Sequence, residues 1–223
     1  MKTKVKKSNV GKIKVSRFPI NQPKLNLACG KNKVEGFFGV DKVIVPGLVD
    51  EVVDLTLFPW PIKSESTDEI ICSHYVEHIP HDSFTSSFEN ILRKKVNYAD
   101  FRKEMIKFFN IVPSEGFVAF MEELHRIMKK GSLAKIICPY WSSIRCWQDP
   151  THRRGMNEAS FLYFNKAWRD VNVGQYPITT DFDYSYGYDI SPDLLTKAQE
   201  VKDFAIKNYT NAVMDIQYLL TKR

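Results

Sequence analysis

A short apolar segment and an acid beyond it have the residue types of a site for a nucleoside-containing ligand. The segment Leu25 to Ala28 breaks at Gly30. Because glycine has no side chain, the main chain there can pass close to a bound ligand. Asp41 ends the next apolar segment, which begins at Phe37. This combination is typical of a ligand that lies across the carboxyl ends of parallel strands.

A second group of reactive side chains is the run Asp149-Pro-Thr-His-Arg-Arg154. His152 could serve as a general base, because imidazole titrates near neutral pH. Arg153 and Arg154 could hold an anionic acceptor through a phosphate or carboxylate group. Alternatively, Asp149 pairs with an arginine, and the pair only stabilises the loop. The sequence favours neither interpretation.

The run His74-Tyr-Val-Glu-His78 matches the His-x-x-Glu-His pattern of some zinc peptidases. It directly follows an apolar segment that we interpret as a buried strand, and the sequence shows no obvious third ligand. We therefore expect no metal site. His78 is interpreted as a satisfied, partly buried histidine that fixes the start of a helix.

The elements that must position these residues alternate between strands and helices. Apolar runs and two-residue periodicity predict strands at 25–28, 37–41, 49–55, 68–73, 133–138, 182–190 and 212–220. Helices are predicted at 82–110 as an insertion, at 117–128 with a stop at 129–131, from Asn157 to about Phe164, and from Ser191 onward. This order predicts an α/β fold with a Rossmann-like, mainly parallel sheet sandwiched by helices, late antiparallel strands and a helical insertion after the fourth strand. Residues 31–36 are few for a parallel crossover, so we expect a single tight helical turn there.

Composition describes an ordinary soluble globular protein. The 223 residues are 43% hydrophobic and 26% charged, which suits one domain with a full core. No apolar run reaches the roughly 20 residues of a membrane span, and no secretory signal follows the basic start, so we expect a cytoplasmic protein without a membrane partner. The four cysteines lack the spacing of a disulfide or zinc framework. Three of them adjoin predicted core strands, where free cysteine usually behaves as a small hydrophobe.

The formal charge of +6 is concentrated at the N-terminus. Residues 1–34 hold ten Lys or Arg and no acid, which leaves 22 basic against 26 acidic residues in the remainder. The body of the chain is therefore no polycation. We expect residues 1–20 to form a basic, solvated arm, and a nucleic-acid partner is possible but not favoured.

Four blocks, taken in order, resemble class I S-adenosylmethionine-dependent methyltransferases, in the subgroup similar to the methyltransferase type 11 domain. The blocks are Leu25–Gly30, Gly36–Asp41, Ser66–His78 and Leu124–Gly131, and the resemblance runs from about residue 24 to residue 164. It implies S-adenosyl-L-methionine as cofactor. It also implies a methyltransferase domain over residues 21–223, with the helical insertion at about 80–115.

The same resemblance implies a set of site residues. Asp41 would accept hydrogen bonds from two ribose hydroxyls, and Asp54 with Leu55 would line the adenine. Ser73 and His74 would face the methionine part and the reacting methyl group. The other expected cofactor-binding residues are Asn26, which stands where the family often has an acid, Ala28, which stands where it usually has glycine, Cys29 and Gly30. The expected catalytic residues are His152 and His74.

Two other enzyme classes require residue patterns that the sequence lacks. A nicotinamide dehydrogenase needs three spaced glycines and an acid about 20 residues further on, whereas Asp41 follows Gly30 after 11. A DNA amino-methyltransferase is disfavoured, because Cys72-Ser-His-Tyr stands where that group has an Asp- or Asn-Pro-Pro-aromatic motif. We predict a small-molecule or saccharide acceptor, suited by nearby tryptophans and tyrosines. The alternatives are an RNA methyltransferase that uses the basic arm, and a non-catalytic cofactor-binding or interaction protein. The sequence specifies no oligomeric state.

Overall fold

The computed structural model describes residues 19–81, 116–174 and 176–223. Nearly all of the expected basic arm at 1–20 and most of the expected insertion at about 80–115 lie outside these residues, as does the predicted helix at 82–110. Among the residues described, no helix has the length and apolar character needed to cross a membrane.

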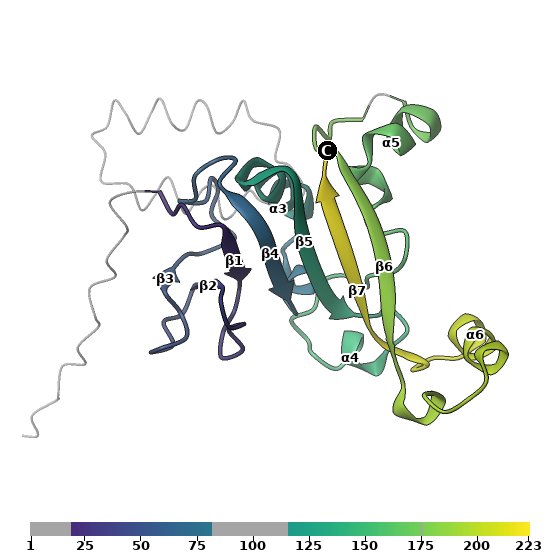
Figure 1. Ribbon diagram of the computed structural model, residues 1–223. Coiled ribbons are helices and arrows are strands. Elements are labelled where there is room, and N and C mark those ends of the chain that lie inside the picture. The colour runs from purple at the N-terminus through teal and green to yellow at the C-terminus, as the bar shows by residue number, and fades with distance from the viewer. Residues whose placement is uncertain (1–18, 82–115, 175) are drawn as a thin grey trace, which may run out of the picture.

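The described residues build one seven-stranded sheet in the order β3-β2-β1-β4-β5-β7-β6 (Figure 1). Its strands are β1 Lys24–Leu27, β2 Phe38–Asp41, β3 Glu51–Val52, β4 Thr67–Ser73, β5 Met128–Pro139, β6 Phe182–Ile190 and β7 Val213–Lys222. The pairs from β3 to β5 are parallel, and β7 runs antiparallel to both β5 and β6. The prediction of a Rossmann-like, mainly parallel sheet with late antiparallel strands is confirmed. Strand order reverses between β1 and β4, which is where such sheets form a crevice at their carboxyl ends.

Helices flank this sheet. They are α3 Gly116–Ile127, α4 Ile144–Trp147, α5 Lys166–Asn172 and α6 Gln199–Asn208, with 3₁₀ turns at Val76–His78, Leu162–Phe164 and Pro192–Leu194. α3 lies against the face of β4 and β5 (Figure 1), and its Phe120, Met121 and Leu124 are fully buried. Strand β1 contributes Leu25 and Leu27 to the same core. The centre of the sheet is thereby fixed, and the strand ends that form the crevice are held with it.

Two helix predictions were wrong, one in its last residues and one in the presence of a helix. The helix expected to stop at residues 129–131 ends at Ile127, and β5 begins at Met128, because Met128 pairs with Thr67 of β4. The helix expected from Asn157 to Phe164 is only a set of turns and one 3₁₀ turn. The Asn157 side chain accepts from the backbone of Ala159 within a turn. The cap belongs to Asn165, whose Oδ1 accepts from the backbone N–H of Trp168 at the start of α5.

Other local predictions were also wrong. The third strand, expected over 49–55, covers only Glu51–Val52. The helix expected from Ser191 is a 3₁₀ turn without a side-chain cap, and α6 begins later, at Gln199. The connection at 31–36 contains no helical turn. It is held instead by the buried Asn26, whose Oδ1 accepts from the Val34 N–H at 2.8 Å.

Candidate functional site

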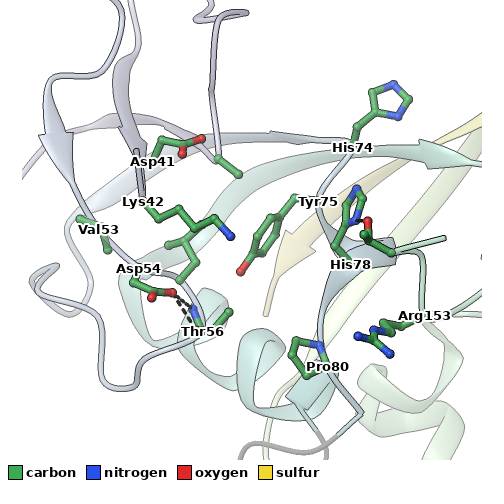
Figure 2. Close-up of a pocket in the computed structure, with 13 residues that line it drawn as sticks. Asp41, Lys42, Val53, Asp54, Thr56, His74, Tyr75, His78, Pro80 and Arg153 are labelled. Atoms are coloured by element: carbon green, nitrogen blue, oxygen red, sulfur yellow. Dashed lines mark hydrogen bonds between the residues drawn. The ribbon is translucent and has the colours of Figure 1, made fainter. Parts of the chain in front are cut away.

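A cavity of about 460 Å³ opens at the carboxyl ends of β1, β2 and β4 (Figure 2). Its volume is within the range of small-molecule sites. The lining residues are Ala28, Asp41, Lys42, Val53, Asp54, Leu55, Thr56, His74, Tyr75, His78, Pro80, Thr151 and Arg153. Five residues that the sequence predicted for the site therefore share one cavity: Ala28, Asp41, Asp54, Leu55 and His74.

The backbone is strained where two neighbouring strands reach this cavity. Ala28 after β1 and His74 after β4 have φ angles of 50° and 52°, in the left-handed region that non-glycine residues rarely adopt. Such a conformation costs roughly 1 to 3 kcal/mol and persists only when the surroundings enforce it. Here the His74 N–H donates to the Ile137 carbonyl at 2.8 Å. Both residues line the cavity, as strained residues at ligand sites often do.

Asp41 is fixed by backbone donors on both oxygens. Its Oδ2 accepts from the Gly30 N–H at 2.9 Å, and its Oδ1 accepts from the Val43 N–H at 3.0 Å. Gly30 has a φ of 50°, which favours glycine at this turn. An ionised carboxylate offers about four acceptor positions, so roughly two remain for a ligand. Asp41 can therefore accept from a pair of hydroxyl groups without losing its own support.

The loop that carries Asp54 and Leu55 is anchored to α3. The Trp60 indole is buried edge-on against Phe120, with ring centroids 5.3 Å apart, and its Nε1 donates to the Leu55 carbonyl at 3.0 Å. The Asp54 carboxylate is held by the backbone and the hydroxyl of Thr56. The short strand β3 is thus followed by a rigid loop that sets one wall of the cavity.

Four predicted cofactor-binding residues do not line the cavity. Asn26 is 2% exposed and supports the connection between β1 and β2. The Cys29 thiol is buried and contacts the Leu48 carbonyl at 3.8 Å. Ser73 pairs with Ile137 within the sheet. Gly30 is also absent from the lining, although its N–H is bound to Asp41 at the edge of the cavity.

Tyr75 stands in the cavity, and the sequence reasoning missed it. Figure 2 shows its ring projecting between the Asp41–Asp54 wall and the His78–Arg153 wall. Burial raises the pKa of the Tyr75 phenol, and the nearby acidic groups raise it further, so the hydroxyl stays protonated and can donate. The available signal was its position directly after His74, the residue that follows β4. Lys42 and Thr56 also line the cavity. The same signal applies to them, because each follows a predicted site residue in the sequence.

The far wall joins two segments that are distant in the sequence. Thr151 donates its hydroxyl to Asp149 Oδ1 at 2.7 Å and lies 2.9 Å from His78 Nδ1. Asp149 thus takes hydrogen bonds from Thr151, and Arg153 is left to line the cavity. His152 does not line it; its Nδ1 contacts the Cys146 carbonyl at 2.7 Å, and its ring lies 4.6 Å from the ring of His78.

His74 is the titratable side chain at the rim. Its side chain is 49% exposed, and its Nδ1 lies 3.5 Å from Glu77 Oε1. The Glu77 carboxylate raises the pKa of His74, and this effect outweighs the opposite effect of burial. The imidazole therefore keeps its proton to a higher pH than an ordinary histidine does.

No protein-family model and no curated protein matches the chain. Solved structures with a similar fold include a SAM-dependent methyltransferase from Archaeoglobus fulgidus, with 16% identity, a TM-score of 0.47 and coverage of 92% of this chain and 88% of that one. The YcgJ protein from Bacillus subtilis has 13% identity, a TM-score of 0.45 and coverages of 95% and 96%. A SAM-dependent methyltransferase from Methanosarcina mazei has 11% identity, a TM-score of 0.43 and coverages of 90% and 93%.

Two of these three structures are named as the class of protein that the sequence resemblance predicted, and the type 11 subgroup stays a prediction. At such identities and TM-scores the likeness carries no weight for activity or cofactor.

Proposed function

We propose that the protein is an S-adenosylmethionine-dependent methyltransferase. The observation that carries the proposal is the cavity at the point where strand order reverses, with Asp41 fixed on its wall and two acceptor positions left over. A ribose with two adjacent hydroxyls matches that acceptor pair. The strained backbone at Ala28 and His74 supports a ligand site at the same strand ends.

Within this proposal, different residues of the cavity contact different parts of the cofactor. Asp41 would accept from the ribose hydroxyls, and Asp54 with Leu55 would border the adenine. Ala28, beside Gly30, would let the backbone approach the ligand, and His74 would lie towards the methionine part. When bound, the cofactor supplies a methyl group already activated on a sulfonium. The protein then needs mainly to align the acceptor in line with the C–S bond and to exclude water.

We also propose that the acceptor is a small molecule or saccharide that enters beside His74 and Arg153. The exposed indoles of Trp141 and Trp147 support this, since both pack beside Gly155, two residues after Arg153. Flat aromatic faces suit sugar rings and other small ligands. Where the acceptor is a hydroxyl, His74 would take its proton while the new O–C bond replaces the C–S bond, so that the sulfur leaves as a neutral thioether. His152, buried against Cys146, would then act only indirectly.

Calorimetric titration with S-adenosylmethionine tests the cofactor assignment. Saturating ligand at about 100 times its Kd should stabilise the fold by about 2.7 kcal/mol, seen as a rise of roughly 5 to 10 °C in Tm. Asp41→Asn should weaken affinity by roughly 10- to 100-fold, because it removes a charged acceptor. Asp68→Asn is the matched control, since Asp68 is an exposed carboxylate at the start of β4 that pairs with Lys129.

Adenosine analogues sharpen the same experiment. Removing the two ribose hydroxyls should weaken binding to the wild type and leave binding to Asp41→Asn unchanged. Equal affinity of S-adenosylmethionine for the wild type and Asp41→Asn would refute the assigned role of Asp41. Absence of binding at millimolar ligand would refute the proposed function.

A further inference from the structure

Glu77 is a buried carboxylate without a proper partner. It is 1% exposed, and within residues 19–81, 116–174 and 176–223 neither of its oxygens has a hydrogen-bond partner. The nearest basic atom is His74 Nδ1 at 3.5 Å, which is long for a charge-assisted hydrogen bond. Burial of a charged carboxylate is strongly unfavourable unless it is paired, hydrogen-bonded or bound to a metal ion. Within the described residues, Glu77 therefore has no positively charged partner at hydrogen-bond distance.

Two imidazoles lie beside this carboxylate. One ligand atom from each of Glu77, His78 and His152 lies within 4.8 Å of the others. We call these three residues the Glu77 cluster. Two donors on one tetrahedral metal ion lie about 3.4 Å apart when the bonds are about 2.1 Å long, so small side-chain rotations would close the set. His78 also lines the cavity, which places the cluster in its wall.

The hydrogen bonds of both histidines fix which nitrogen is available. His152 Nδ1 faces the Cys146 carbonyl at 2.7 Å, and a carbonyl only accepts, so Nδ1 carries the proton. The Thr151 hydroxyl donates its proton to Asp149. Its oxygen therefore accepts a hydrogen bond from His78 Nδ1 at 2.9 Å. In their neutral forms both rings therefore keep a lone pair on Nε2. Such support of one ring nitrogen by an oxygen atom is typical of metal-binding histidines.

We propose that Glu77, His78 and His152 bind a divalent first-row transition-metal ion in the wall of the cavity. Two imidazoles and one carboxylate suit Zn²⁺, Co²⁺ or Fe²⁺ better than Mg²⁺ or Ca²⁺, which prefer oxygen ligands. A proton on Glu77 could satisfy one imidazole lone pair, whereas a metal ion satisfies all three groups. Three protein ligands also leave a coordination position for water or for an oxygen of the acceptor.

This site explains the run from Asp149 to His152 as a unit. His152 is a ligand, Thr151 holds the other histidine, and Asp149 holds Thr151. The sequence pattern at residues 74–78 offered no third ligand, and the fold brings one from 74 residues beyond His78.

The test uses the tag-free full-length chain, freed of metal with a chelator and titrated with Zn²⁺ by calorimetry and with Co²⁺ by visible absorption. One ion per chain should bind with saturation. Glu77→Gln, His78→Asn and His152→Asn should each weaken affinity about a hundredfold or more. Asparagine places its amide nitrogen where Nδ1 stood, so it keeps the hydrogen bond and removes only Nε2. Any one of the three variants that keeps the wild-type circular dichroism spectrum decides the question.

His125→Asn is the control, because His125 is a half-buried histidine on α3 that packs against Phe182. It should bind both ions like the wild type. Wild-type affinity in any of the three variants, no saturable binding at millimolar Zn²⁺, or Mg²⁺ binding as tight as Zn²⁺ would each overturn the proposal. The titrations contain no S-adenosylmethionine, so their outcome is independent of the proposed cofactor.

Discussion

Two carboxylates near the carboxyl end of β5 differ in their hydrogen-bond partners. Glu158 accepts hydrogen bonds from the hydroxyls of Tyr140, at 2.7 Å, and Tyr188, and its backbone carbonyl accepts from Tyr184. We call Glu158, Tyr140 and Tyr188 the Glu158 cluster. The Glu77 cluster instead gathers a carboxylate and two imidazole lone pairs, which are all acceptors.

This difference in hydrogen bonding distinguishes a structural cluster from a candidate ligand site. In the Glu158 cluster donors and acceptors match, so the cluster is complete within the protein and ties β6 to the segment after β5. In the Glu77 cluster the described residues donate no hydrogen bond to the carboxylate, and we infer that a cation from outside completes the cluster. A polar cluster that is satisfied by the chain stabilises the fold, whereas one that is left with acceptors only indicates a ligand.

The largest effect is expected from breaking the complete cluster. Glu158→Ala leaves two tyrosine hydroxyls without their charged acceptor and should lower the free energy of unfolding by about 3 kcal/mol. Urea denaturation measures this change. Glu35→Ala, which removes an exposed loop carboxylate, should change stability by less than about 0.5 kcal/mol. Similar values for the two variants would show that the Glu158 cluster contributes nothing special.

The incomplete cluster should respond with the opposite sign. In metal-free protein, Glu77→Gln should raise the free energy of unfolding by about 1 to 2 kcal/mol, because it removes a buried carboxylate that accepts no hydrogen bond from the described residues. With Zn²⁺ at about 100 times its Kd the wild type should gain about 2.7 kcal/mol and overtake the variant. Urea denaturation with and without Zn²⁺ measures both values. If Glu77 served only to pair with His74, the variant would be less stable in both conditions.

Local patterns in the sequence predicted the sheet well. The two-residue alternation from Phe182 to Ile190 predicted β6 with the bounds that the structure has, because each residue's face follows from its own position. The apolar run before Gly30 and the acid at Asp41 likewise predicted two strand ends that meet at the cavity. Parallel strands bring such ends together whatever the intervening chain does.

Features that depend on tertiary packing were beyond the sequence. Asn157 and Asn165 are both acceptable helix caps, and the fold uses Asn165 while the intervening Phe161 and Phe164 pack against Phe117. The approach of His152 to His78 depends on the course of the chain after β5, which no local period encodes. The pairing of these histidines is therefore visible only in the folded chain.

The smallest of these effects is the pH dependence of the complete cluster. Burial alone raises the pKa of Glu158, but hydrogen bonds from Tyr188, its own backbone and Tyr140 outweigh burial and hold the pKa below its ordinary value. A lowered folded-state pKa means stability that is present above the unfolded value of 4.5 and lost as pH falls below it. Burial, followed by the bond to Glu158, raises the pKa of Tyr140 from 10.0 to about 12. A raised pKa means stability that is complete below pH 10 and lost as pH rises towards 12.

Comparison of the wild type with Glu158→Gln isolates the pH dependence of stability that comes from the Glu158 cluster. The stability difference between the wild type and Glu158→Gln should be constant from about pH 6 to pH 9 and should narrow both below pH 4.5 and above pH 10. Free energies of unfolding from urea curves across the pH range measure it. A difference that stays constant at both extremes would mean that the hydroxyl–carboxylate bonds do not depend on the charge of Glu158. The contrast with the Glu77 cluster would then rest on packing alone.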